Sequence, residues 1–195
     1  MTQSLFNTDG TRKYLTAEER RAFLEAAGKA DRDVRTFCSL LAYTGCRISE
    51  ALALTVDRVD ITNNLIVFES LKKRKKGVFR AVPVPSSFID ALDMVHGLRE
   101  LKKKAVGGKA VPLWEWSRTT AWRRVKEVMD AAGLQDGVHS SPKGLRHGFG
   151  VAAVKNGIAL NMAQRWLGHA HITTTAIYAD AVGEEEHAIA ARMWE

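Results

Sequence analysis

Four polar side chains stand out in the otherwise apolar stretch 143–180, namely Arg146, His147, His169 and Tyr178. An arginine presents a planar fork of donors that matches the oxygens of a phosphate group. A tyrosine hydroxyl is one of the side-chain groups that can act as a covalent nucleophile. Taken singly, each residue also fits an ordinary structural role, so the chemical prediction depends on their combination. Together, an arginine, a histidine and a tyrosine carried on successive short elements can surround one phosphate.

The elements that would position these residues are short helices. An apolar run ends at Asn156, and a second helical pattern over 162–167 ends at Gly168; both residues are common helix stops. His169 comes directly after that glycine, where the backbone can fix the direction of its ring.

Composition limits the class of protein. A chain of 195 residues suits one domain with at most a small appendage, and a formal net charge of +7 favours an anionic partner. Cys38 and Cys46 lie in apolar helical sequence and are predicted to be buried free thiols, which with no secretory signal indicates a reducing compartment. No His/Cys pair has metal-ligand spacing, and no apolar run is long enough to span a membrane.

The chain begins with a polar segment, 1–13, which is predicted to form a loose arm. Thr16 and Glu19 then make a capping box that predicts a helix ending at Gly28. A second helix runs from an aspartate near position 31 to the break at Gly45.

Arg47 follows that break at the mouth of a new short helix, and Glu50 lies one turn further along. This placement exposes the guanidinium while the following turns enter the core. Glu50 shares its helical face and can hold Arg47 in an ion pair. Such a pair can also be purely structural.

The two-residue period that begins near Val56 predicts a small antiparallel sheet. A hairpin turning at Asn63 and Asn64 is followed by a strand over 79–84. Helices are then expected over three further ranges, which are 86–101, Ser117 to Gly133, and 184–194. The predicted fold class is mostly α with a small antiparallel β-sheet, an α+β domain.

Five consecutive cations precede Gly77, between the second and third predicted strands. A run of this kind is usually only solvated, but a basic β-turn can also lie in a DNA groove and contact phosphates. The helix that begins at Ser117 is a second basic candidate. The residues predicted to bind DNA are Lys73, Arg74, Lys75, Lys76 and Arg80.

Four features in this order resemble the catalytic domain of tyrosine recombinases, also called phage integrases. They are TGCRISE at 44–50, a lysine in the hairpin, LRHGF at 145–149 and LGHAHITTTAIY at 167–178. The resemblance extends from Leu15 to the C-terminus, which implies an arm over 1–14 and a catalytic domain over 15–195. Most members carry a helical core-binding domain before it, and no such domain is expected within residues 1–195.

The resemblance implies roles for individual residues. Arg47 and Arg146 resemble the two catalytic arginines, His169 the histidine of the third box, and Tyr178 the nucleophile. The family usually has a histidine at the position of Lys143, where a lysine can still donate to a phosphate oxygen.

The catalytic lysine of the hairpin is assigned by counting. Counting forward from the strand that ends at Glu69 favours Lys72, and counting back from the next strand favours Lys75. We prefer Lys72, because extra residues are most easily placed at the hairpin tip, and Lys73 is a third candidate.

The function implied is that of a site-specific DNA recombinase or integrase, which cleaves and rejoins DNA through a 3′-phosphotyrosyl link without metal, ATP or another cofactor. The expected partner is double-stranded DNA, and no membrane contact is expected. The chain is expected to form a homotetramer on DNA and to be a monomer or weak oligomer in isolation. The expected location is the cytoplasm, in association with the nucleoid, for a protein of bacterial, phage or mobile-element origin. Three alternatives remain: a strand-relaxing enzyme like type IB topoisomerases, a catalytically weakened DNA-binding module of the same fold, and a structural helical domain with a basic face.

Overall fold

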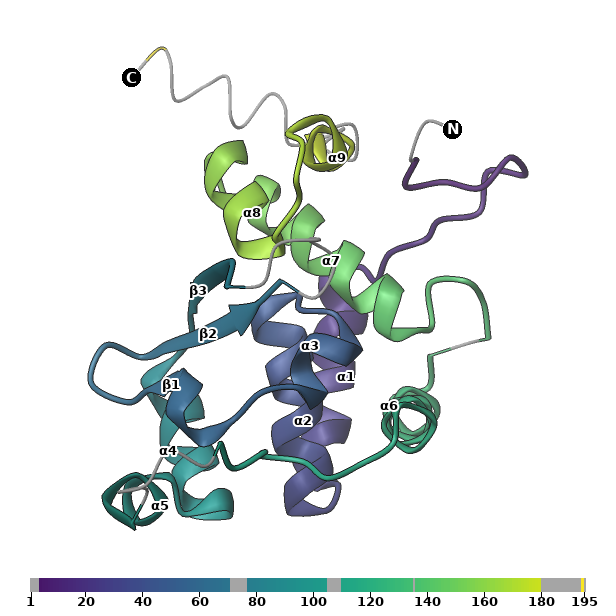
Figure 1. Cartoon of the computed structure of the whole chain (residues 1–195). Coiled ribbons are helices and arrows are strands. Elements are labelled where there is room, and N and C mark those ends of the chain that lie inside the picture. Colours follow the sequence, from purple (N-terminus) through teal and green to yellow (C-terminus); the bar gives the residue numbers. More distant parts are fainter. Residues whose placement is uncertain (1–3, 71–76, 105–109, 135, 180–193, 195) are drawn as a thin grey trace.

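A computed structural model of the chain describes residues 4–70, 77–104, 110–134, 136–179 and 194. The fold is mostly helical, with a small three-stranded antiparallel sheet at one side of the helices (Figure 1), and this is the fold class that the sequence predicted. The elements in chain order are α1 (Ala17–Lys29), α2 (Arg32–Thr44), α3 (Ile48–Leu52), the 3-10 turn η1 (Val56–Arg58), β1 (Val59–Asp60), β2 (Leu65–Glu69), β3 (Phe79–Pro83), α4 (Ser86–His96), α5 (Leu98–Lys104), α6 (Arg118–Ala131), α7 (Pro142–Lys155), α8 (Leu160–Leu167) and α9 (Thr173–Ala176).

Several helix ends follow the predicted capping chemistry. The side chain of Thr16 accepts from the backbone N–H of Glu19, whose carboxylate in turn accepts from the N–H of Thr16. This reciprocal pair satisfies two backbone donors at the start of α1. Ser117 caps α6 in the same way, by accepting from the N–H of Thr120.

Two predicted helix boundaries were wrong. The helix expected over 86–101 is divided at Gly97, which has a φ of 63° and ends α4 in the left-handed region that glycine adopts without strain. Conversely, Gly28 does not end α1, which continues to Lys29. The capping contacts at its N-terminus and its packing on α2 outweigh the small intrinsic penalty of one glycine.

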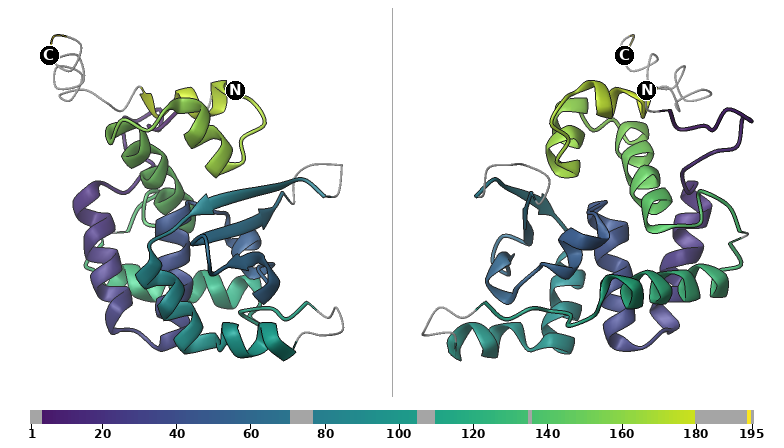
Figure 2. Two further views of the ribbon diagram at one scale, coloured as in Figure 1. Left: turned by 90° about the vertical axis from the view of Figure 1, so that its left-hand side faces the viewer. Right: turned by 45° about the vertical axis from the view of Figure 1, so that its right-hand side comes forward.

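The sheet has the order β1-β2-β3, and β2 and β3 extend away from the helices (Figure 2, left). Its register pairs Phe68 with Arg80. In β3 the side chains alternate, so Arg80 and Val82 are buried while Phe79 and Ala81 are exposed. A charged side chain therefore points inward from this strand.

The main hydrophobic core is centred on α2, which packs against α1, α4 and α7. Phe37, Leu40 and Leu41 of α2 are almost completely buried. Burial of one such side chain contributes roughly 1.5–3 kcal/mol. Cys38 and Cys46 are buried and unpaired, as predicted, and burial raises the pKa of each thiol to about 12.

The N-terminal segment is not the loose arm that its polar sequence suggested. Leu5 is only 3% exposed and belongs to a second apolar cluster, with Val151, Leu167, Ile177 and Tyr178. Arg12 forms an ion pair with Glu19 that attaches the segment to α1. Residues 4–14 therefore pack on the domain.

Glycines on α7 allow its close approach to neighbouring segments. A Cβ at Gly148 would lie 2.6 Å from the backbone oxygen of Leu15, and one at Gly150 would lie 2.5 Å from the ring of Tyr178. Neither contact leaves room for a methyl group. In Figure 1, α7 lies between α1 and α2 on one side and α8 and α9 on the other. Side chains on α7 can therefore contact both groups of helices.

Candidate active site

Arg47 occupies the N-cap position of α3, two residues after Gly45 ends α2 in the left-handed region. Its Nη1 donates to Oε1 of Glu50 at 2.8 Å, and its backbone N–H donates to Oε2 of the same carboxylate at 2.8 Å. The predicted ion pair is thus present. About a quarter of the Arg47 side chain, 27%, is exposed to solvent.

Glu50 is buried and joins two arginines. Besides Arg47, it accepts from Nη2 of Arg80 at 2.7 Å, and Nε of Arg80 donates to the carbonyl of Trp166 at 2.7 Å. Burial alone would raise the pKa of Glu50, but the hydrogen bond and charge of Arg80, with the contribution of Arg47, lower it overall. Glu50 is therefore a carboxylate at neutral pH.

Arg80, which the sequence predicted to bind DNA, has its guanidinium engaged inside the protein. The residue is 8% exposed, and its guanidinium is held by Glu50 and by the end of α8. These contacts make the buried cation a structural link between β3, α3 and α8.

Arg146 projects from α7 and is also buried. Nη1 donates to the carbonyl of Gly45 at 2.7 Å, and Nη2 donates to the carbonyl of Leu167 at 2.6 Å. Burial, followed by the charge of Arg47, lowers the pKa of Arg146 to about 10, which still leaves it charged at neutral pH. Both acceptors are neutral, so the site keeps an excess of positive charge.

His169 follows Gly168, which ends α8 in the left-handed region as predicted. Nδ1 of its ring lies 2.9 Å from the hydroxyl of Thr175, and the ring stacks on that of Tyr178 at 6.2 Å between centroids. Burial, then the charges of Arg146 and Arg47, lower the pKa of His169 to about 3. The imidazole is therefore neutral at neutral pH.

Tyr178 follows α9 and has no solvent exposure. Its hydroxyl oxygen lies 3.1 Å from Nδ1 of His147. Burial raises the pKa of Tyr178, while the charges of Arg146 and Arg47 act in the opposite direction. Tyr178 packs in the second apolar cluster, with its hydroxyl directed to His147.

Apart from Arg80, the predicted residues thus fall into three groups. Arg47, Arg146, His169 and Tyr178 interact electrostatically or by direct contact. Lys143 is exposed in the first turn of α7, close enough for its charge to contribute to the lowered pKa of His147. The hairpin cations Lys72, Lys73, Arg74, Lys75 and Lys76, and the predicted helix 184–194, lie outside the described residues, apart from Trp194.

A groove runs beside this cluster, between the β2–β3 hairpin and α8. It is lined by Ser70 and Phe79 on the hairpin side and by Asn161, Gln164 and His169 on the other. Its volume is about 330 Å³. Of the predicted catalytic residues, His169 is the one that lines this groove.

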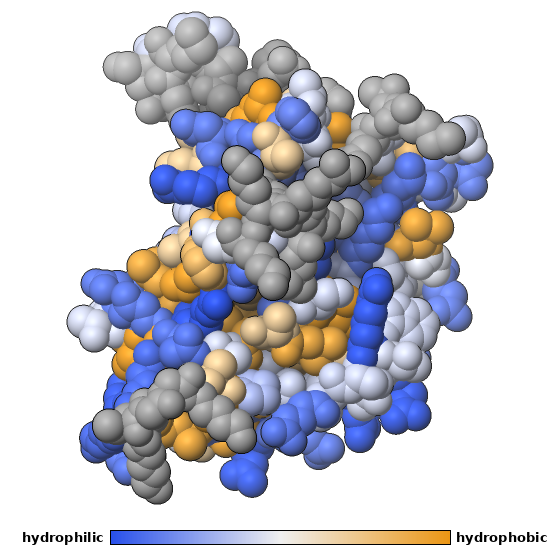
Figure 3. Space-filling view, in the orientation of Figure 1, coloured by the Kyte–Doolittle hydropathy of each residue, from blue (hydrophilic) through white to orange (hydrophobic). Residues whose placement is uncertain are grey.

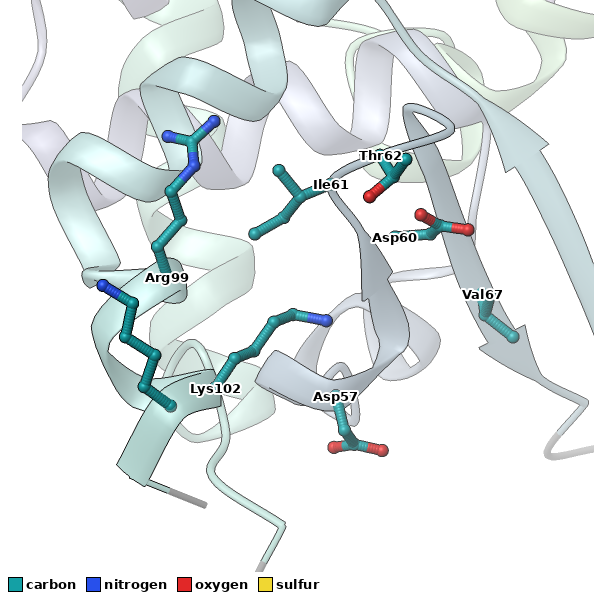
Figure 4. Close-up of a pocket in the computed structure, with 8 residues that line it drawn as sticks. Asp57, Asp60, Ile61, Thr62, Val67, Arg99 and Lys102 are labelled. Atoms are coloured by element: carbon teal, nitrogen blue, oxygen red, sulfur yellow. The ribbon is translucent and has the colours of Figure 1, made fainter. Parts of the chain in front are cut away.

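Another hollow lies away from the cluster, between η1, the β1 turn and α5 (Figure 4). Acidic Asp57 and Asp60 face basic Arg99 and Lys102 there, and no predicted site residue lines it. Among the described residues, no group of three His, Cys, Asp or Glu side chains is arranged to hold a metal ion, and no helix has the length and apolarity to cross a membrane. Figure 3 shows hydrophobic residues reaching the surface in patches between hydrophilic ones.

Two interactions of the site were not anticipated. The inward position of Arg80 has a sequence signal, since a two-residue period places it on the same face as Val82. The contact between His147 and Tyr178 joins residues 31 positions apart and has no local signal.

Comparison with known sequences identifies relatives. The sequence profile of the Phage integrase family matches residues 13–185. The tyrosine recombinase XerD of Mycobacterium leprae (strain TN) is 35% identical over 182 residues, which cover 85% of this chain and 56% of that protein. The tyrosine recombinase XerA of Thermococcus onnurineus (strain NA1) is 29% identical over 179 residues, which are 85% and 57% of the two chains. The chain therefore spans little more than half the length of these relatives.

Solved structures share the fold. A crystal structure of XerA recombinase superposes with a TM-score of 0.69 at 29% identity, covering 85% of this chain and 59% of that one. The post-cleavage complex of XerH site-specific recombinase with a palindromic difH substrate gives a TM-score of 0.74 at 22% identity, covering 98% and 56%. The latter similarity concerns the fold alone.

Proposed function

The chain belongs to the Phage integrase family, and on this premise we propose that it cleaves and rejoins double-stranded DNA as a site-specific tyrosine recombinase. The observation that carries the proposal is the position of Tyr178, beside His169 and within the field of Arg146 and Arg47. A phenol surrounded by cations and neutral imidazoles suits attack on a phosphodiester.

In the proposed reaction the hydroxyl of Tyr178 attacks the scissile phosphorus, giving a 3′-phosphotyrosyl link and a free 5′-hydroxyl. Arg47 and Arg146 stabilise the negative charge that develops on the non-bridging oxygens, with His169 assisting. A hairpin lysine, Lys72 in our assignment, protonates the departing oxygen. A 5′-hydroxyl then attacks the phosphotyrosine and reseals the strand, and because each step exchanges one phosphate ester for another, neither requires ATP.

DNA is the partner that the relatives support. The XerH structures are described as bound to difH substrate. We infer that residues 15–195 form the catalytic domain and that chains assemble as a tetramer on two duplexes, with Lys73, Arg74, Lys75 and Lys76 contacting phosphates. Because these relatives come from prokaryotes, we infer that the chain acts on DNA in the cytoplasm of a prokaryotic cell.

Two other readings share the fold. A type IB topoisomerase would relax supercoiled plasmid without producing recombinants, and a silent DNA-binding module would bind without forming a covalent link. The relatives, which are named recombinases, favour recombination over both.

The test is to trap the covalent intermediate. A duplex nicked close to the cleavage point releases a short fragment after attack, so rejoining is prevented and the adduct accumulates. We expect a denaturant-resistant adduct that maps to Tyr178. Tyr178→Phe removes only the hydroxyl and should abolish the adduct while DNA binding is preserved. An adduct that persists in this variant, or maps to Tyr14 or Tyr43, would contradict the proposal.

A further inference from the structure

We propose that His147 is a catalytic residue, the base that removes the proton from Tyr178 as the tyrosine attacks DNA. The inference rests on the proposed function, because it assigns a further role within the same reaction. Sequence resemblance gave His147 no role, and the function described above does not use it.

The geometry directs one ring nitrogen of His147 at the reacting atom. Nδ1 lies 3.1 Å from the hydroxyl oxygen of Tyr178, which is within the range for direct proton transfer. The two rings are tilted by 54° with centroids 5.9 Å apart, so the contact is made through this edge of the imidazole.

The surroundings fix this contact. His147 follows Arg146 on α7, and Gly148 brings the helix against the backbone of Leu15. On the other side of the tyrosine, Gly150 leaves the ring in contact with the helix backbone. Tyr178 is completely buried, so its hydroxyl has no access to bulk water as a proton acceptor.

A buried phenol needs such an acceptor, because an unperturbed tyrosine has a pKa near 10 and burial raises that of Tyr178 further. Burial, followed by the charges of Lys143, Arg146 and Lys13, lowers the pKa of His147 to about 4. The imidazole is therefore neutral at neutral pH and has a lone pair available. The charged groups that act on it, from α7 and the N-terminal segment, are all cationic.

Docking of DNA would strengthen this base. A phosphodiester carries one negative charge and would lie against Arg146, offsetting the positive field that disfavours protonation of His147. The pKa of His147 then moves toward neutrality, where a general base is most effective. Proton removal from the nucleophile is thereby favoured when substrate is present.

Lys143 cannot take this role as an ammonium group. It precedes His147 by four residues, one helical turn, and is exposed. An ammonium has three donors and no acceptor, so Lys143 can stabilise a phosphate oxygen but cannot receive a proton. We therefore assign stabilisation of phosphate charge to Lys143 and proton transfer to His147.

The proposed step balances as follows. The phenolic proton of Tyr178 moves to Nδ1 of His147, the phenolic oxygen forms a bond to phosphorus, and the bond from phosphorus to the 5′-oxygen breaks. That oxygen takes its proton from the hairpin lysine. In the reverse step the 5′-hydroxyl gives its proton back to the hairpin lysine as it attacks phosphorus, the bond from phosphorus to the tyrosine oxygen breaks, and the imidazolium returns its proton to that oxygen.

Single-turnover adduct formation on the nicked substrate, at saturating DNA, tests this role. His147→Ala and His147→Gln should slow cleavage on the order of 10²–10⁴-fold, the usual contribution of a general base, without weakening DNA binding. Glutamine can accept a hydrogen bond from Tyr178 but cannot carry the proton. His171→Ala, which changes an exposed histidine of the same region, is the matched control and should cleave at the wild-type rate.

Two further measurements separate a base from a merely structural residue. Added imidazole should restore part of the activity of His147→Ala but none of that of Tyr178→Phe. A substrate with a 5′-bridging sulfur, whose leaving group needs no proton, should rescue loss of the lysine acid and leave His147→Ala slow. Thermal melting of each variant checks that the fold is retained.

The outcomes distinguish this inference from the proposed function. If the wild-type protein forms no adduct, the proposed function itself fails. If it does, wild-type cleavage by His147→Gln would overturn the assignment of a base, as would rescue of His147→Ala by the bridging sulfur. An alanine variant that does not fold leaves the glutamine variant to decide.

Discussion

Replacement of Glu50 by glutamine tests whether the buried carboxylate holds the arginines of the site in place. Glu50 has only 2% of its side chain exposed and accepts hydrogen bonds from Arg47 and Arg80 at 2.7–3.3 Å. Glutamine preserves the shape but replaces one acceptor oxygen with an NH₂ group, which then faces arginine donors. The variant leaves the buried guanidinium of Arg80 without a counter-charge.

The expected cost follows from that uncompensated charge. Removal of one partner of a buried ion pair destabilises a protein by roughly 3–5 kcal/mol. For a domain of this size each kcal/mol lowers the melting temperature by about 2–4 °C, so Glu50→Gln should melt about 6–20 °C lower. Circular dichroism at 222 nm measures the transition, and Glu25→Gln, at an exposed position of α1, should change it little.

The pH dependence gives a second measure of the same pair. Since the folded-state pKa of Glu50 is lowered, its ionisation contributes stability that is complete above the unfolded-state value, roughly 4.3. That contribution disappears as the pH falls through the lower folded-state pKa. The difference in melting temperature between wild type and Glu50→Gln should therefore be constant from pH 8 to about pH 5 and shrink in more acidic solution. A variant that melts with the wild type at pH 7 would refute the reasoning.

Three further predictions concern the reaction. Gly150→Ala introduces a Cβ 2.5 Å from the ring of Tyr178, so it should displace the nucleophile and reduce adduct formation at least tenfold while gel-shift affinity for DNA is kept. Lys143→Ala should lower the single-turnover cleavage rate about tenfold through loss of a phosphate-facing charge, and Lys143→His should retain more activity; equal rates for alanine and wild type would make the lysine a bystander. In the hairpin, alanine replacement of a lysine that contacts phosphate should weaken DNA binding and reduce the slope of log affinity against log salt concentration by about one unit. Alanine replacement of the lysine that acts as the acid should instead slow cleavage, and the bridging-sulfur substrate should restore it. Rescue of Lys75→Ala but not Lys72→Ala would reverse our assignment.

The fold was largely predictable because local chemistry specified its elements. The capping box at Thr16 and the glycine after Leu167 set helix ends through backbone hydrogen bonds that involve near neighbours. The helix end at Gly97 was not predicted. Gly97 directly follows His96 and ends α4 in the left-handed conformation. In that case the apolar periodicity continued across the break and hid it.

The sequence predicted which residues form the site better than it predicted which of them contact one another. Motif order indicated Arg47, Arg146, His169 and Tyr178, and these residues do lie together, although their roles remain proposals. Contacts between distant segments depend on tertiary packing, which no local pattern encodes. Leu5 illustrates this, because one apolar residue within a polar segment gave no indication that it would be buried beside the tyrosine.

The excess of guanidinium groups over carboxylates around Glu50 has a consequence for selectivity among anions. Arg47, Arg80 and Arg146 carry three positive charges, and the carboxylate of Glu50, which accepts from Arg47 and Arg80, offsets only one of them. Such a site attracts any small oxyanion, so inorganic phosphate and free nucleotides compete with the scissile phosphate for the same donors. Discrimination in favour of a long polymer must then come from the many simultaneous phosphate contacts that only DNA can supply. DNA affinity should accordingly fall further in phosphate buffer than in chloride of equal ionic strength.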